Sequence, residues 1–260
     1  MENKTTIEKT NILIVHVDNR LSTLDYLTLT KRSIEEKVIP YLKKYGPVLS
    51  YEYQYIHIPS EYHEKIHPAT AKILIVKDIL EGKIASSTPS SYDVLVFLDS
   101  DAWINSPDHL NDLIIYLQSE PNKHGCFSRD PCKKINTYIN SGSFILKINE
   151  YNRQLYQQIY HDMMEEDSHH HNWPYDQFYI SNRIFQRKED FIILSTEILN
   201  TPYGIILKHN WRKNNRMYYD LYEMLEKAYQ FPITKPMNIF EYLDFTPFPN
   251  ENDNGLNYDD

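Results

Sequence analysis

The stretch from Asp93 to Pro107 constrains the fold more than any other part of the chain. It reads Asp-Val-Leu-Val-Phe-Leu-Asp-Ser-Asp-Ala-Trp-Ile-Asn-Ser-Pro. Val94 to Leu98 is an unbroken apolar run, too short for a helix and rich in β-branched and aromatic residues, which predicts a strand buried on both faces. Asp99 and Asp101 follow at its carboxyl end, and this is the edge at which open α/β sheets bind ligands.

Two carboxylates at the mouth of an apolar sheet need a positive partner, because keeping both ionised and unpaired carries a large desolvation cost. No Lys or Arg lies close to Asp99 and Asp101 in the sequence. A divalent cation that also takes phosphate oxygens, Mg²⁺ or Mn²⁺, is one candidate. The other is a capped strand end whose aspartates bond backbone N–H groups of the turn. The Asp-x-Asp pattern alone does not separate the two.

The N-terminal part of the chain repeats the pattern of an apolar strand followed by polar residues. Ile12 to Val17 predicts a buried first strand, and Asp18, Asn19 and Arg20 form the loop at its carboxyl end. This loop is expected beside the Asp99 loop, which makes its residues candidates for base and ribose contacts of a nucleotide. An ordinary strand-to-helix turn with a capping Asp or Asn is the alternative.

The segments between these strands predict an α/β fold with a parallel sheet. Helical spacing runs from Ser22 to Lys44, with a break expected near Pro40, and Tyr51 to Ile58 alternates as a half-exposed strand. A strand, a helix and a strand in this order imply a parallel pair joined by a right-handed crossover. Pro68 opens a further helix that ends near Glu81.

Composition narrows the function classes. The 260 residues suffice for one large α/β domain, and the net charge of −9 argues against a general nucleic-acid binder, which needs a basic face. Only Cys126 and Cys132 are present, so two free thiols and a reducing compartment are expected. The short, charged N-terminal run predicts neither a signal peptide nor a membrane span, and therefore a cytoplasmic or otherwise soluble protein.

Four segments, taken together and in this order, resemble glycosyltransferases with the GT-A fold, and family 34 in particular. This family includes α-galactosyl, α-mannosyl and xyloglucan α-xylosyl transferases. The segments are Leu-Asp-Ser-Asp-Ala at 98–102, Asn-Ser-Gly-Ser-Phe-Ile-Leu-Lys at 140–147, Trp-Pro-Tyr-Asp-Gln-Phe at 173–178, and His209 after an apolar strand. The resemblance implies a single-domain, Rossmann-like mixed sheet flanked by helices, over residues 1–230. Residues 231–260 are expected to be a C-terminal extension with a disordered acidic tail from about Pro247.

The resemblance also implies roles for individual residues. Asp99, Asp101 and His209 would hold Mn²⁺ or Mg²⁺ on the diphosphate of a nucleotide sugar, and Asp176 and Gln177 would lie at the reacting sugar. The other implied donor-binding residues are Asp18, Asn19, Arg20, Lys72, Ser100, Asn140, Ser141, Gly142 and Lys208. Arg212 and Lys213 could help Lys208 to screen the diphosphate. The structural alternatives are a turn at Asn140, a helix cap at Asp176 and a structural His209.

The sequence therefore predicts a metal-dependent glycosyltransferase that moves a sugar from a nucleotide diphosphate, UDP in the first instance, to a hydroxyl of a saccharide acceptor. Family 34 retains anomeric configuration, and an inverting enzyme with Asp176 as base is the alternative. A non-catalytic module that binds a nucleotide sugar is a second alternative. A nucleotidyltransferase would carry a Gly-rich phosphate loop, and only 6 Gly are present. The run His169 to His171 predicts solvated or acceptor-contacting side chains, since adjacent histidines cannot surround one ion.

Overall fold

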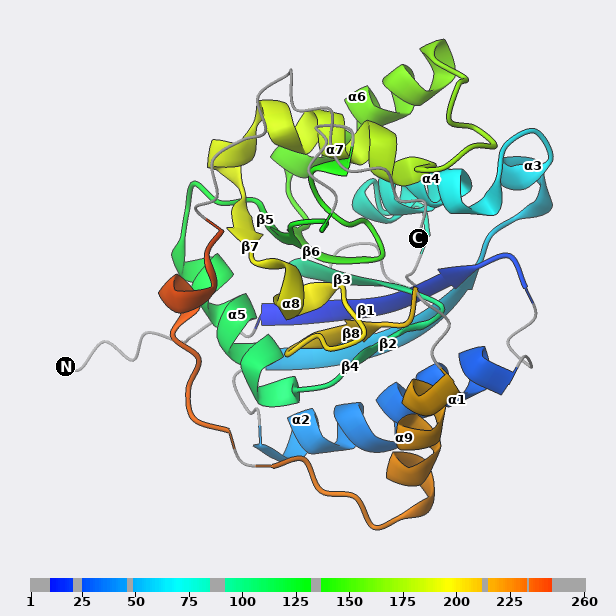
Figure 1. Ribbon diagram of the computed structural model, residues 1–260. Coiled ribbons are helices and arrows are strands. Elements are labelled where there is room, and N and C mark those ends of the chain that lie inside the picture. The colour runs from blue at the N-terminus through cyan, green and yellow to red at the C-terminus, as the bar shows by residue number, and fades with distance from the viewer. Residues whose placement is uncertain are drawn as a thin grey trace.

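The apolar runs of the sequence form the inner strands of a mixed sheet in the computed structural model, which describes residues 10–20, 25–45, 49–84, 92–131, 137–211, 215–232 and 234–244 (Figure 1). The six strands of this sheet stand in the order β2-β1-β3-β6-β5-β7. Their bounds are β1 Thr10–Asp18, β2 Leu49–His57, β3 Val94–Asp99, β5 Gly125–Ser128, β6 Ser143–Lys147 and β7 Ile192–Leu194.

The direction of β6 makes the sheet mixed. β1 pairs in parallel with both β2 and β3, as the sequence predicted for the first two strands. β6 runs antiparallel to β3 and to β5, and β5 is parallel to β7. The start of β6 therefore lies at the same edge as the carboxyl end of β3, where Asp99 stands. A separate two-stranded ribbon pairs β4 (Ala102–Ile104) with β8 (Leu207–His209).

Helices cover both faces of the sheet because successive residues of β1 and β3 point to opposite sides. One core takes Ile12, Ile14, Val94 and Val96 and lies against α1 (Asp25–Ser33), α2 (Ile39–Tyr45), α5 (Pro107–Ser119) and α9 (Asn215–Glu226). The other takes Leu13, Val15, Leu95 and Phe97 and lies against α4 (Pro68–Leu80), α6 (Glu150–Glu165) and α7 (Asp176–Gln186). Figure 1 shows α4, α6 and α7 above the sheet and α1, α2 and α9 below it.

The predicted break near Pro40 is wrong. The helix continues past Pro40 and changes instead to a π-helical turn, η1 (Ile34–Val38), one turn earlier. Within it the Ile39 N–H donates to Ile34 O, five residues back. Pro40 has no N–H and crowds the carbonyl four residues before it, and a locally wider turn accommodates this without ending the helix.

Two short α-helices and two 3₁₀ turns connect the longer elements of the described ranges. They are α3 (Ser60–His63), α8 (Thr196–Leu199), and the 3₁₀ turns η3 (Lys188–Asp190) and η4 (Ile239–Tyr242). Within the predicted extension, Phe231 and Ile239 are buried, and the Ser195 N–H donates to Tyr242 O at 2.8 Å. The predicted tail from Pro247 lies outside the described residues, and the domain division at residue 230 stays a prediction. In the described ranges, every helix is too short or too polar to cross a bilayer.

Candidate active site

Asp99 and Asp101 stand where the sequence predicted, on the turn between β3 and β4. The Asp99 N–H donates to the carbonyl of Gly142 at 2.7 Å, which joins this turn to the start of β6. On the far side of the turn, Ala102 pairs with His209 across the β4–β8 ribbon, and the Asn210 N–H donates to Asp101 O at 3.0 Å. Three segments that are distant in sequence therefore meet at one sheet edge.

This convergence brings the predicted metal ligands together. His209 Nε2 lies 3.2 Å from Asp101 Oδ1 and 3.8 Å from Asp99 Oδ2. One donor atom from each of the three residues falls within 4.8 Å of the others. His209 is buried, and the two aspartates keep about a quarter of their side chains exposed. The site is thus open to a ligand on the carboxylate side only.

Lys72 supplies a positive charge that the local sequence around Asp99 does not. Its ammonium reaches from α4 to Asp99 Oδ1 at 2.6 Å and lies 3.6 Å from Asp176 Oδ2. Lys72 is buried, and Phe97 lies under its charge, 5.9 Å from the ring centroid to Nζ. Helix packing therefore delivers a lysine to one of the two aspartates, in addition to any cation that the pair could hold.

Asp176 and Gln177 are the first two residues of α7. Both are buried, and both leave a polar atom without a hydrogen-bond partner among the described residues: Asp176 Oδ2 and Gln177 Nε2. Against the effect of burial, which raises it, the nearby Ser141 hydroxyl lowers the pKa of the Asp176 carboxyl. A buried carboxylate oxygen and a buried amide without partners are uncommon in folded proteins and mark a place where a ligand can complete the bonding.

The charges of the site shift one another's pKa values. Burial raises the pKa of Asp176 to about 6, against the pull of Lys72. Burial would raise that of Asp101 too, but the His209 imidazole outweighs it and lowers the pKa to about 2. Burial lowers the pKa of Lys72, and the carboxylates of Asp176 and Asp99 reverse this, so the ammonium stays charged.

A cleft of about 770 Å³ opens in front of this group. Lys72, Asp99, Ser100 and Asp101 line it, and so do Asp18, Asn19 and Arg20 from the end of β1, as predicted. Arg20 donates to the Asp18 carboxylate through its backbone N–H, Nε and Nη2, and to Ser100 Oγ through Nη2 at 3.0 Å. The first loop is thus tied to the Asp99 turn, which supports the sequence interpretation that the two loops are neighbours.

The Asn140–Gly142 segment contacts the site mainly through its backbone, because the side-chain amide of Asn140 is used to hold the turn. Asn140 is held in a turn, because its Oδ1 accepts from the Gly142 N–H and its Nδ2 donates to Asp130, both at 2.9 Å. The ring of His209 packs directly on Gly142: a Cβ atom there would fall 2.1 Å from the ring carbon Cε1. A glycine at this position is what allows the imidazole to reach the aspartates.

Several predicted residues are not among those that line this cleft, namely Asn140, Ser141, Gly142, Asp176, Gln177, His209 and Lys208. Lys208 alternates with His209 along β8 and lines a second cleft beside Asn105. Arg212 and Lys213 lie outside the described residues, as does Cys132, while Cys126 is a buried free thiol. The predicted solvation of the histidine run is wrong for His169 and His170, which are half-buried, whereas His171 is exposed. His169 stacks on Phe178, and His170 and His171 bond the backbone carbonyls of Met163 and Lys65, so the run links α6 to the segment before α4.

Other residues of the site were not recognised in the sequence. His67 caps α4 by accepting from the Ala69 N–H at 3.1 Å, lines the cleft, and stacks on Tyr175 with 4.3 Å between ring centroids. Tyr175 has a φ of 53°, which a residue with a bulky side chain rarely adopts. A His before a helix-opening Pro is a weak capping signal, and nothing local indicates its partner.

His16 is a second unrecognised residue. It is fully buried on β1, and its ring bonds Tyr53 Oη through Nδ1 and Ala102 O through Nε2, both at 2.8 Å. Burial lowers its pKa to about 4, so the ring is neutral near pH 7: it donates to the carbonyl and accepts from the hydroxyl. The His16 ring therefore holds the backbone of Ala102, the residue that follows Asp101, in place.

Comparison with solved structures identifies the fold. The chain is similar to a glycosyltransferase involved in glycosylation of the major capsid of PBCV-1, with a TM-score of 0.55 and 18% identity, over 81% of this chain and 99% of the other. It is also similar to galactosyltransferase LgtC, solved with donor and acceptor sugar analogs, with a TM-score of 0.52 and 11% identity over 85% and 97% of the two chains. No protein-family model and no curated protein sequence matches. The predicted GT-A glycosyltransferase fold is confirmed, and the resemblance to family 34 stays a prediction.

Gly142→Ala should displace the His209 ring. The backbone at Gly142 is open to any residue, so the cost comes from the 2.1 Å contact with the imidazole and should be roughly 1–3 kcal/mol in unfolding free energy. In a His209→Ala background the same change should cost close to nothing. Urea unfolding of the four proteins of this cycle measures the difference. An equal cost in both backgrounds would contradict the contact.

Ionisation of Asp176 should make stability depend on pH. Its folded pKa of about 6 lies above the ordinary 3.8, so the ionised carboxylate costs stability above pH 6 and this cost fades as pH falls toward 3.8. Between pH 5 and pH 7.5 the wild type should lose about 1.4 kcal/mol relative to Asp176→Asn. Denaturant midpoints of both proteins at the two pH values test this. Parallel pH profiles would show that Asp176 titrates normally.

Proposed function

We propose that the protein is a metal-dependent glycosyltransferase that transfers a sugar from a nucleotide diphosphate, in the first instance UDP, to a hydroxyl of a saccharide. The observation that carries this is the meeting of Asp99, Asp101 and His209 at the mouth of a 770 Å³ cleft, in a fold shared with glycosyltransferases. The cleft volume suits a nucleotide-sized ligand.

The three side chains fit a hard divalent cation. Neighbouring ligand atoms of an octahedral ion with bonds of about 2.1 Å are roughly 3 Å apart, close to the 3.2 and 3.8 Å that separate His209 Nε2 from the carboxylate oxygens. Two carboxylates and one imidazole suit Mn²⁺ or Mg²⁺. Lys72 occupies Asp99 Oδ1, and Asp99 Oδ2 faces His209. A bound ion would neutralise the diphosphate as it leaves.

The residues around this group would bind and orient the donor. Asp18, Asn19 and Arg20 line the part of the cleft that a base and ribose would occupy. Lys72 and Ser100 lie between this loop and the reacting centre, where a buried ammonium would favour a sugar diphosphate. Asn140 holds the turn that brings Gly142 to His209, and the Ser141 hydroxyl would help to keep the Asp176 carboxylate ionised.

Asp176 and Gln177 would act at the sugar. As the bond from the anomeric carbon to the diphosphate oxygen breaks, positive charge develops on the ring, and a carboxylate or amide oxygen beside it stabilises this charge. The acceptor hydroxyl forms the new bond and passes its proton to the departing diphosphate oxygen. Asp176 Oδ2 supports this role, because it has no hydrogen-bond partner among the described residues and its ion-pair partner, Lys72 Nζ, is 3.6 Å away. The Gln177 Nε2 group also lacks a partner in these ranges, and as a donor it would bond a sugar hydroxyl rather than the developing charge.

We propose retention of anomeric configuration, on the resemblance to family 34. The alternative makes Asp176 a general base on an inverting path, which its raised pKa also permits. NMR of the anomeric proton in the product should show an α-linkage from an α-linked donor. A β-linkage would assign Asp176 as the base and reject retention.

UDP should stabilise the protein much more with Mn²⁺ than without it, because a ligand of the folded state raises the unfolding temperature. At about a hundred times its dissociation constant, the rise should be roughly 5–10 °C. Asp101→Ala should abolish the Mn²⁺-dependent part. Asp220→Ala, an exposed aspartate of α9, is the matched control and should keep it. Equal shifts with Mn²⁺ and with EDTA would contradict the metal site.

Catalysis is tested separately by Mn²⁺-dependent hydrolysis of UDP-sugars. A protein that shows the thermal shift but hydrolyses and transfers none of them would be a nucleotide-sugar-binding module rather than an enzyme.

A further inference from the structure

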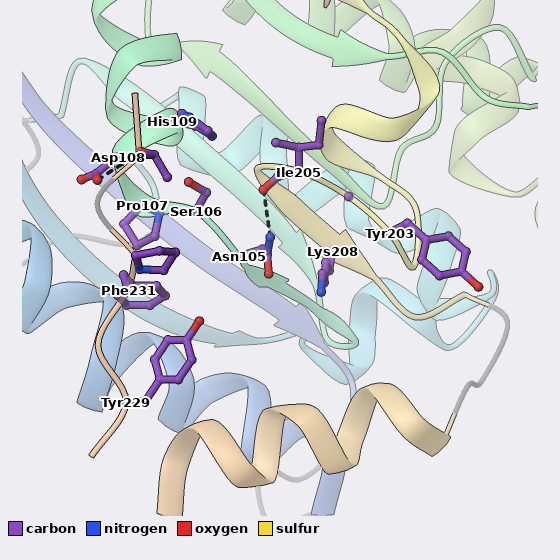
Figure 2. Close-up of a pocket in the computed structure, with 13 residues that line it drawn as sticks. Asn105, Ser106, Pro107, Asp108, His109, Tyr203, Ile205, Lys208, Tyr229 and Phe231 are labelled. Carbon is purple, nitrogen blue, oxygen red and sulfur yellow. Dashed lines mark hydrogen bonds between the residues drawn. The ribbon is translucent and has the colours of Figure 1, made fainter. Parts of the chain in front are cut away.

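A second cleft, of about 420 Å³, lies on the side of the β4–β8 ribbon that Lys208 faces (Figure 2). Its lining comes from the start of α5, from the loop before β8, and from four residues near the end of the described chain: Tyr229, Phe231, Pro232 and Thr234. Among the described residues, it shares none with the cleft at Asp99. Lys208 points into it because side chains alternate along β8, and His209 takes the opposite side. The two clefts are therefore separate sites.

The walls of this second cleft combine aromatic rings with polar groups. Figure 2 shows Tyr203 on one side and Tyr229 with Phe231 on the other, with Asn105 and Lys208 between them. Tyr203 is 81% exposed and Tyr229 41% exposed, so both rings present accessible faces. Phe231 is buried beneath Tyr229, with 5.3 Å between ring centroids.

The polar groups of the cleft leave bonding capacity for a ligand. The Lys208 ammonium has no ion-pair partner in the part of the chain that the structure describes. Asn105 uses its Nδ2 on Ile205 O at 3.0 Å, which turns the other end of its amide away from that bond. Asp108, by contrast, already accepts from the Tyr41 hydroxyl with both carboxylate oxygens and from the Thr234 hydroxyl with Oδ2.

We infer that this cleft binds a sugar residue of the acceptor glycan, away from the bond that is formed. The inference rests on the proposed function for the nature of the ligand. A pyranose has an apolar C–H face, which packs on an aromatic ring, and a rim of hydroxyls, which accept from an ammonium and exchange bonds with an amide. The volume lies within the range of small-molecule sites, about 300–1,000 Å³.

The position of the cleft suits a longer acceptor. Asn105 follows Asp101 by four residues along extended backbone, a distance of about 13 Å. A branched or oligomeric glycan can therefore place one sugar at the second cleft while another hydroxyl is offered at Asp176. The cleft would then select glycans by a feature remote from the reacting hydroxyl and would not alter the chemistry itself.

A printed panel of oligosaccharides, probed with the full-length protein in EDTA and without UDP, tests the inference. The wild type should bind a subset of the panel, and Asp101→Ala should bind the same subset, because the second cleft needs no metal. Tyr203→Ala and Tyr229→Ala should each weaken this binding by roughly fivefold or more. Tyr219→Ala is the matched control, an exposed tyrosine on α9 that lines neither cleft, and should change nothing.

Three results would overturn the inference: a wild type that binds no glycan, binding that survives both cleft substitutions, or binding that Asp101→Ala abolishes, which would place it at the first cleft. Tyr203 is almost fully exposed, so its loss leaves the fold intact, and a melting curve of each variant checks this. Failure here is distinct from failure of the transferase proposal, because that proposal is read from UDP and Mn²⁺ and this one from glycan binding alone.

Discussion

The electrostatic balance at the end of β3 is the constraint around which the rest of the site is built. Asp99, Asp101 and Asp176 place three carboxylates at one edge of an apolar sheet, and burial alone would drive them to protonate. Lys72 from α4 and His209 from β8 offset this charge from two opposite sides. The aspartate pair stands at the end of β3, and Lys72, Asp176 and His209 come from three other elements, so the position of the helices on the sheet decides whether the site can hold its charges.

The residues that carry charge in this site differ from the residues that hold its backbone in place. Lys72 is bound between Asp99 and Asp176, which leaves the outer oxygens of Asp99 and Asp101 to face His209 and the cleft. His16 and Gly142 act one layer further back: one bonds the carbonyl of Ala102, and the other leaves room for the imidazole. The charged groups can therefore respond to a ligand while the backbone beneath them stays in place.

Much of this could be predicted from the sequence, because the strongest signals are local. Continuous apolar runs indicated β1 and β3, and polar residues directly after them indicated the ligand-binding edge. What could not be predicted depends on packing between distant segments. Nothing near Asp99 in the chain indicates Lys72, since α4 must first be placed on the sheet. The side of the ribbon that Lys208 faces likewise depends on the register of β8 with β4.

The reversed strand β6 has a consequence for how the molecule holds together. Asp99, Asp101 and Lys72 belong to the first half of the chain, and Asp176 and His209 belong to the second. β6 is the strand of the described sheet that joins the two halves, through its pairing with β3. The β4–β8 ribbon is a second link between the halves, because it pairs Ala102 with His209. A ligand that contacts residues on both sides of the β3–β6 pairing would hold the two halves together. Its binding should slow amide hydrogen exchange in the strands on both sides of β6 at the same time.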